Sequence, residues 1–172
     1  MMQSPSRKIT TAAAFVAVGL IMGYIESFIV LPVGIPGFRI GIANIAVVLA
    51  MYLLGPVYGG CILLIRVILA AMLFGSGASF LYSLCGGVLS YAVMVVLSRH
   101  GFSVYGVSAA GAVVHNIAQT LVAYVLIGSV YVMTYIPVLM IIGVFAGLLV
   151  GFISNIIYKR LRRILCFNEE GI

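Results

Sequence analysis

Apolar residues run along almost the whole chain, and short groups of glycine, proline or charged residues interrupt them at five places. Most of the uninterrupted runs approach the roughly 20 residues that a helix needs to cross a membrane. The pattern predicts an all-α protein, a single domain of six transmembrane helices. Their approximate ranges are 9–30, 40–54, 57–74, 78–98, 104–127 and 134–158.

The connection between the first two predicted helices combines helix breakers with charge. Pro32 and Pro36 exclude a straight helix, because proline lacks a backbone donor and clashes with the preceding turn. Glu26, just before them, is the only acidic residue ahead of position 169, and Arg39 is the only basic residue between positions 9 and 65. We expect residues 32–41 to cover a polar site inside a membrane protein.

Composition supports a membrane protein independently of the pattern. The 172 residues are 65% hydrophobic and 7% charged, whereas a soluble domain carries about 25% charged residues. The net charge is +6, and four of the nine basic residues lie at 159–163, beside a predicted membrane exit. This placement favours a topology signal and contact with anionic lipids, and it argues against nucleic acid as a partner.

The distribution of lysine and arginine predicts the orientation. With the N-terminus inside, only Arg39 lies in an outer connection. Basic residues concentrate on the cytoplasmic side of membrane proteins, so both termini are predicted to be cytoplasmic in a multi-pass protein of the cell membrane. The predicted cytoplasmic set is Arg7, Lys8, Arg99, Lys159, Arg160, Arg162 and Arg163.

Two predicted helices carry polar residues at their centres. Arg66 lies near the middle of the third, where a charge costs at least about 2.5–3.5 kcal/mol and should face the bundle interior. It is a candidate ligand-binding residue, with a structural arginine as the alternative. The fifth helix carries His115, Asn116 and Gln119. Hydrogen bonding between helices could explain one of these residues, but three together favour a site.

Polar residues of the other helices fall in the predicted outer half. Ser79, Tyr82, Ser83 and Gly86 share one face at i, i+3, i+4 and i+7. This asymmetry predicts a pocket open to the outside and closed toward the cytoplasm. The predicted substrate-binding residues are Glu26, Arg39, Asn44, Arg66, Ser79, Tyr82, Ser83, His115, Asn116 and Gln119.

Small residues recur at four-residue spacing in two helices. Gly143, Gly147 and Gly151 favour close packing inside the bundle. Ala13 and Ala17 allow either internal packing or contact with another protein, and the spacing alone does not decide between them.

The sequence lacks the usual groups for catalysis. There is no aspartate to hold magnesium and a diphosphate, and no phosphate-binding loop. Only two histidines are present, so no metal site is predicted, and no cofactor is expected. The chain alone is predicted to bind a ligand rather than to be an enzyme.

Several segments resemble a known family: YIES at 24–27, GIPGFRIGIAN at 34–44, FGS at 74–76, SFLYS at 79–83 and HNIAQ at 115–119. The chain resembles the bacterial Gx transporter family, also labelled heptaprenyl diphosphate synthase component I. That family is similar to the substrate-binding S components of energy-coupling factor (ECF) transporters, which have six helices, both termini inside, and a loop covering an outward site.

The resemblance implies a function and partners. It implies capture of a small ligand and dependence on a transmembrane coupling subunit and ATPases. Arg39 and Arg66 indicate an anionic ligand, and Tyr82 could stack on an aromatic ring. Ala13 and Ala17 match the spacing of the A-x-x-x-A motif that docks the coupling subunit. One alternative is a non-catalytic membrane subunit of a polyprenyl diphosphate synthase, and another is a structural scaffold without a ligand.

Overall fold

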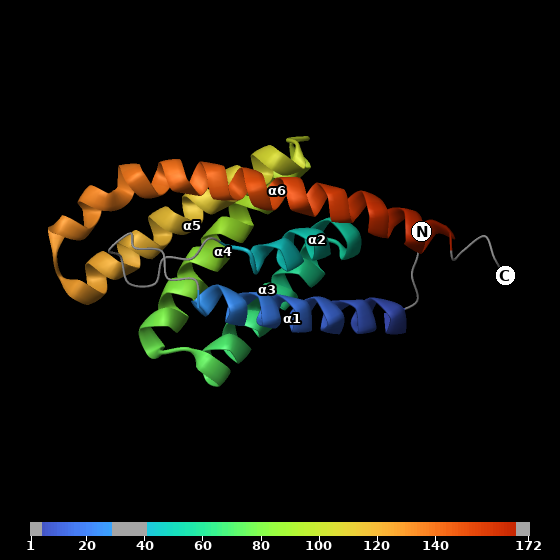
Figure 1. Cartoon of the computed structure of the whole chain (residues 1–172), viewed down its shortest axis with the longest axis horizontal. Coiled ribbons are helices and arrows are strands. Elements are labelled where there is room, and N and C mark those ends of the chain that lie inside the picture. Colours follow the sequence, from blue (N-terminus) through green and yellow to red (C-terminus); the bar gives the residue numbers. More distant parts are fainter. Residues whose placement is uncertain (1–4, 29–40, 168–172) are drawn as a thin grey trace.

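The computed structural model describes residues 5–28 and 41–167, and the side chains of residues 6–28 and 41–163. This part of the chain is helical and contains no strand, which confirms the all-α prediction. The helices are α1 (Pro5–Phe28), α2 (Asn44–Leu54), α3 (Pro56–Phe74), α4 (Gly77–Arg99), α5 (Val104–Ile127) and α6 (Ile136–Phe167), with a short 3₁₀ helix, η1 (Val130–Tyr135), before α6 (Figure 1).

Five of the helices are long and apolar enough to cross a membrane, namely α1, α3, α4, α5 and α6. The chain is therefore a multi-pass membrane protein. Helix α2 has 11 residues and is about 16 Å long, roughly half of the hydrocarbon thickness. The count of six spans and the orientation remain predictions. Most of segment 32–41, including Arg39, lies outside the described residues.

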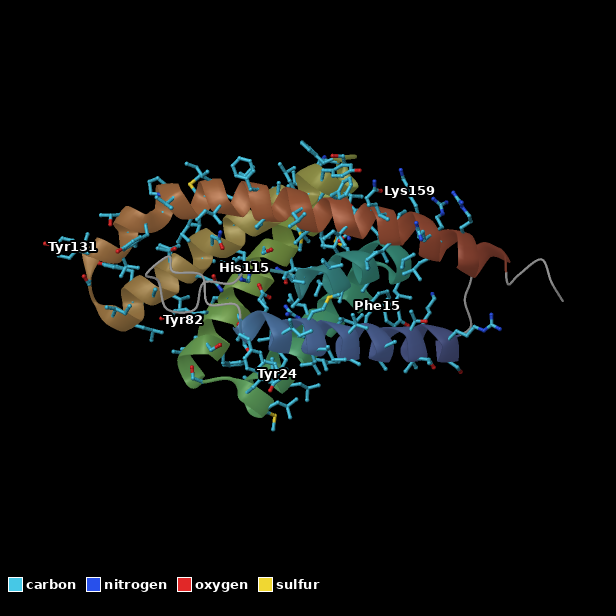
Figure 2. The ribbon with its side chains drawn as sticks, viewed as in Figure 1. Phe15, Tyr24, Tyr82, His115, Tyr131 and Lys159 are labelled. Atoms are coloured by element: carbon cyan, nitrogen blue, oxygen red, sulfur yellow. The ribbon has the colours of Figure 1, made fainter. Side chains whose placement is uncertain are left out.

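The last helix differs from the predicted range of 134–158. Residues 134 and 135 belong to η1, and α6 continues through the basic cluster to Phe167. Lysine, arginine and leucine are good helix formers, and no glycine or proline interrupts residues 152–167. The sequence therefore contains no signal that would end the helix at the membrane boundary. Lys159 lies on this continuation, far from η1 (Figure 2).

The helices pack as two groups, the α1–α3 group (α1, α2 and α3) and the α4–α6 group (α4, α5 and α6), which meet around α2. Helix α1 packs on α2 and α3, while α5 lies between α4 and α6; contacts of α3 with α4 and of α2 with α6 join the groups (Figure 1). Every residue from Ile45 to Met51 is buried, so the short α2 forms the centre of the core.

The glycine stripe of α6 packs against the backbone of α5. A Cβ atom added at Gly147 would lie 2.6 Å from the Cα of Ala109, and one added at Gly151 would lie 2.9 Å from the Cα of Tyr105. At Gly143 it would lie 2.8 Å from the amide nitrogen of Asn116. The interpretation of this stripe as internal packing is confirmed.

Candidate functional site

The start of α2 forms a polar turn inside the bundle. The amides of Asn44 and Ile45 donate to the carbonyls of Gly41 and Ile42, at 2.9 and 3.1 Å. Gly41 has φ of +88°, a conformation that favours glycine. Its own amide donates to the carboxylate of Glu26, which is only 4% exposed. Glu26 therefore ties the end of α1 to the turn before α2.

Arg66 reaches from α3 across to α1 and α2. Its Nη2 donates to Oδ1 of Asn44 at 3.2 Å, and the side chain is buried. A Cβ atom at Gly19 would lie 2.8 Å from Cδ of Arg66, so Gly19 leaves the space that the arginine stem occupies. The burial agrees with the expectation that this charge faces the bundle interior. It places a guanidinium beside the N-terminus of α2, where the helix dipole is also positive.

A cavity opens from Arg66 between α3 and α4. Its volume is about 10 Å³, close to the minimum that holds one water molecule. Ser79 and Ser83 of α4 line it together with Arg66. The remaining lining is Val67, Ala70, Ala71, Gly75 and Phe80. The cavity joins three of the predicted site residues.

A second polar group lies between α4 and α5. His115 and Gln119 pack on Gly86, and a Cβ atom there would lie 3.0 Å from the imidazole ring. The Nε2 of Gln119 is buried and has no hydrogen-bond partner among the described residues. Tyr82, one turn before Gly86, is buried, and it lies toward the same end of the molecule as His115 (Figure 2). This group offers hydrogen-bonding atoms and an aromatic ring.

The structure divides the predicted polar face of α4. Ser79 and Ser83 face the cavity beside α3, whereas Gly86 faces α5. Positions i, i+3, i+4 and i+7 cover a broad stripe, and here two neighbouring helices share it.

Asn116 lies apart from both groups. Its Nδ2 donates to the carbonyl of Leu139 in α6 at 2.9 Å, and its own carbonyl accepts the hydroxyl of Thr120 at 2.8 Å. The bond to Leu139 holds α5 to α6, and the bond from Thr120 lies within α5. The contact favours the packing alternative for Asn116 over a ligand-binding role.

The predicted asymmetry of polar residues is wrong in one respect. Ser90 and Ser108 are buried toward the 99–104 turn, on the side that the sequence was expected to leave apolar. Small hydroxyl residues are common in membrane helices, so their positions gave no distinct signal in the sequence. The described residues hold no group of three or more histidine, cysteine or acidic side chains suited to a metal.

Ala13 and Ala17 are both exposed on α1. They lie on a face that no described helix covers, which favours contact with another protein over internal packing. A partner that docks there remains a prediction.

Neither curated proteins nor solved structures gave a match to this chain. One family model matches residues 15–157, which include α2 to α5, most of α1 and α6, and all ten predicted binding residues. The chain belongs to the family described as heptaprenyl diphosphate synthase component I.

Proposed function

We propose that the chain is the substrate-binding membrane subunit, of the S-component type, of an ECF importer. It captures a small anionic or aromatic molecule at the outer face of a bacterial cell membrane. It depends on a transmembrane coupling subunit and ATPases for transport. The observation that carries this proposal is the hydrogen bond from the buried Arg66 to Asn44 at the N-terminus of α2.

The energetics of that pair support a ligand site. A charge at membrane depth is costly, and such residues usually mark substrate pathways or binding sites. The guanidinium and the positive end of α2 both favour a negative group nearby. Ser79 and Ser83 supply hydroxyls in the adjoining cavity, and Tyr82, His115 and Gln119 supply an aromatic ring and hydrogen-bonding atoms on the next face.

Mass spectrometry of small molecules retained on the purified protein tests the binding role. We expect a molecule with an acidic group that the wild type retains and that competes with added anionic analogues. A protein that retains no small molecule, and binds none of a panel of organic anions, would leave the scaffold alternative standing.

The exposed alanines support docking of a coupling subunit. Close approach of two helices needs small side chains, and Ala13 and Ala17 offer them on an uncovered face of α1. Replacing both with leucine should abolish uptake and co-purification of the coupling subunit while ligand binding persists. Equal loss of ligand binding would show that this face supports the bundle itself.

The outward orientation of the site has its own test. Cysteines placed at Tyr131 and at Phe102, both exposed, should react differently with a membrane-impermeant reagent. In a background without native cysteines, only the variant at Tyr131 should be labelled from outside. The opposite pattern would place the site on the cytoplasmic side.

The family description favours a second candidate, a non-catalytic membrane subunit of a polyprenyl diphosphate synthase. The catalytic carboxylates would then belong to another chain, since this sequence contains no aspartate. Co-purification separates the two: coupling-factor ATPases support the importer, and a soluble aspartate-rich synthase supports the second candidate.

A further inference from the structure

A separate cavity lies beyond Asn44, between α2, α4, α5 and α6. Its volume is about 20 Å³. Among the described residues, its polar lining comes from Asn44, Ser90 and Ser108, together with Gly41. The apolar lining is Val48, Met94, Ala112, Gly147 and Val150. The cavity therefore combines room with hydrogen-bonding groups in the middle of an apolar bundle.

Ser108 is the residue whose hydroxyl indicates that a molecule occupies the cavity. It is 3% exposed, and its hydroxyl has no hydrogen-bond partner in the described part of the chain. Buried polar groups nearly always have a partner, and an ordered water commonly supplies it where protein does not. Ser90, also 3% exposed, lines the same space.

We propose that this cavity holds one ordered water molecule, bound by Ser108, Ser90 and Asn44. A cavity of about 10–15 Å³ or more admits a water, provided that two to four polar groups surround it. The Ser108 hydroxyl donates to the water, and the water donates to Ser90. Oδ1 of Asn44 already accepts from Arg66, which leaves the Asn44 amide nitrogen to complete the site.

The charge around the cavity argues against a cation in the same place. The guanidinium of Arg66 is hydrogen-bonded to Asn44, and the N-terminus of α2 adds a positive dipole. Water, which is neutral and both donates and accepts, suits these groups.

The bound water gives the two serines a role in positioning. Through it, α4 and α5 hold the amide of Asn44, and Asn44 in turn holds the guanidinium of Arg66. The polar network of the bundle then runs from Glu26 in α1 to Ser108 in α5, rather than ending at α2. This inference does not depend on what the protein transports.

X-ray radiolytic footprinting tests the proposal on the wild-type protein. Hydroxyl radicals formed from a bound water oxidise the methionine beside it. Met94 lines the cavity, whereas Met51 does not, and the two are equally buried in one core cluster, at 4% and 5% exposed. We expect Met94 to be oxidised several-fold faster than Met51. Equal, slow oxidation of both would show that the cavity is dry.

Two matched variants test whether Ser108 holds the water. Ser108→Val should fill the cavity and reduce oxidation of Met94 to the level of Met51. Ser154→Val is the control, because Ser154 is also buried with an unpartnered hydroxyl among the described residues but does not line the cavity. Fast oxidation of Met94 that persists in Ser108→Val would overturn the site. If that variant does not fold, the wild-type comparison still decides.

Discussion

Two asparagines are used differently in the two groups of helices. Asn44, in the α1–α3 group, presents its carbonyl oxygen to the charged Arg66, beside two small cavities. Asn116, in the α4–α6 group, donates its amide to the backbone carbonyl of Leu139. Both contacts join two helices, but the first engages a charged side chain and the second a neutral backbone carbonyl. Residue type and membrane depth alone do not separate these roles, but the partner does.

Glycines differ between the two groups in the same way. Gly19 of α1 makes room for a side chain, the stem of Arg66. Gly147 of α6 makes room for a backbone, that of Ala109 in α5. A flexible side chain can move aside, whereas a packed helix backbone cannot. We therefore expect the α4–α6 group to act as the rigid frame and the α1–α3 group to carry the adjustable charged site.

The strongest test of the rigid frame is Gly147→Leu. A Cβ atom alone would lie 2.6 Å from Cα of Ala109 and 2.7 Å from the carbonyl oxygen of Ser108. Overpacking a core side chain typically costs about 1–3 kcal/mol, and a clash with backbone should exceed that. We expect no folded monomer in size-exclusion chromatography after detergent extraction.

A glycine substitution at an uncrowded position in the same pair of helices is the control. At Gly106 of α5 the nearest atom to an added Cβ is 3.6 Å away, an ordinary contact. Gly106→Ala should fold and gain up to about 1 kcal/mol from helix propensity. If Gly147→Leu folds as well as Gly106→Ala, α5 and α6 are not a rigid frame.

The fold was largely predictable because its signals are local. Apolar runs and breakers such as Gly55 and Pro56 indicated where helices end, and α2 through α5 begin and end within a few residues of the expected positions. The end of α6 was not predictable in this way, because no breaker stands at the basic cluster. The four-residue glycine stripe predicted close packing of the last helix inside the bundle, because small residues at that spacing let helices approach; the structure adds that its partner is α5.

The second test removes the charge from the adjustable group. Arg66→Met keeps the length of the stem but loses the guanidinium. Binding of the retained molecule should weaken by about 2–5 kcal/mol, as expected when one partner of a buried charged hydrogen bond is lost. Isothermal titration on detergent-purified protein measures the change, with Arg99→Met as the control because Arg99 is exposed.

A structural role for Arg66 gives a different result. The melting temperatures of Arg66→Met, Asn44→Leu and the double variant distinguish the two. If the pair only ties helices together, each single change lowers the melting temperature. The double variant then loses less stability than the two single variants added together, because both single changes remove the same contact. That pattern, with ligand affinity per folded molecule unchanged, would refute the binding role.

The candidate site was only partly predictable. Arg66 stood out because a charge at membrane depth needs a reason, and its partner Asn44 was also expected in the site. Gly19, Ser90 and Ser108 were not predicted to lie near it. A glycine that leaves space for a side chain, or a single serine in a helix, produces no recognisable pattern along the sequence. Asn116 was expected to bind ligand because it neighbours His115, but the two point to different helices.

The third test, of moderate size, removes the helix tie. Asn116→Leu loses the bond to the Leu139 carbonyl, and interhelical hydrogen bonds in membranes contribute about 0.6 kcal/mol on average and up to about 1.7. The free energy of unfolding should decrease by an amount within that range, and the ligand affinity should not change. Asn155→Leu, which removes the 2.7 Å bond to Tyr105 between the same helices, is the comparison. A large loss of ligand affinity in Asn116→Leu, but not in Asn155→Leu, would instead support a ligand-binding role for Asn116.

The smallest expected effect is the most informative about how Arg66 is positioned. Gly19 and Gly23 are both buried on α1, one turn apart. A Cβ atom at Gly19 would lie 2.8 Å from Cδ of Arg66, whereas at Gly23 the nearest atom is Cβ of Ala43 at 3.7 Å. Because alanine is the better helix former by about 0.8–1 kcal/mol, Gly23→Ala should be neutral or stabilising. Gly19→Ala gains the same propensity but displaces the arginine stem, so it should keep its stability and weaken ligand binding by less than about 1.4 kcal/mol, a factor of ten. Equal affinity in the two variants would show that the stem of Arg66 adjusts freely, and that Gly19 does not help to place the charge.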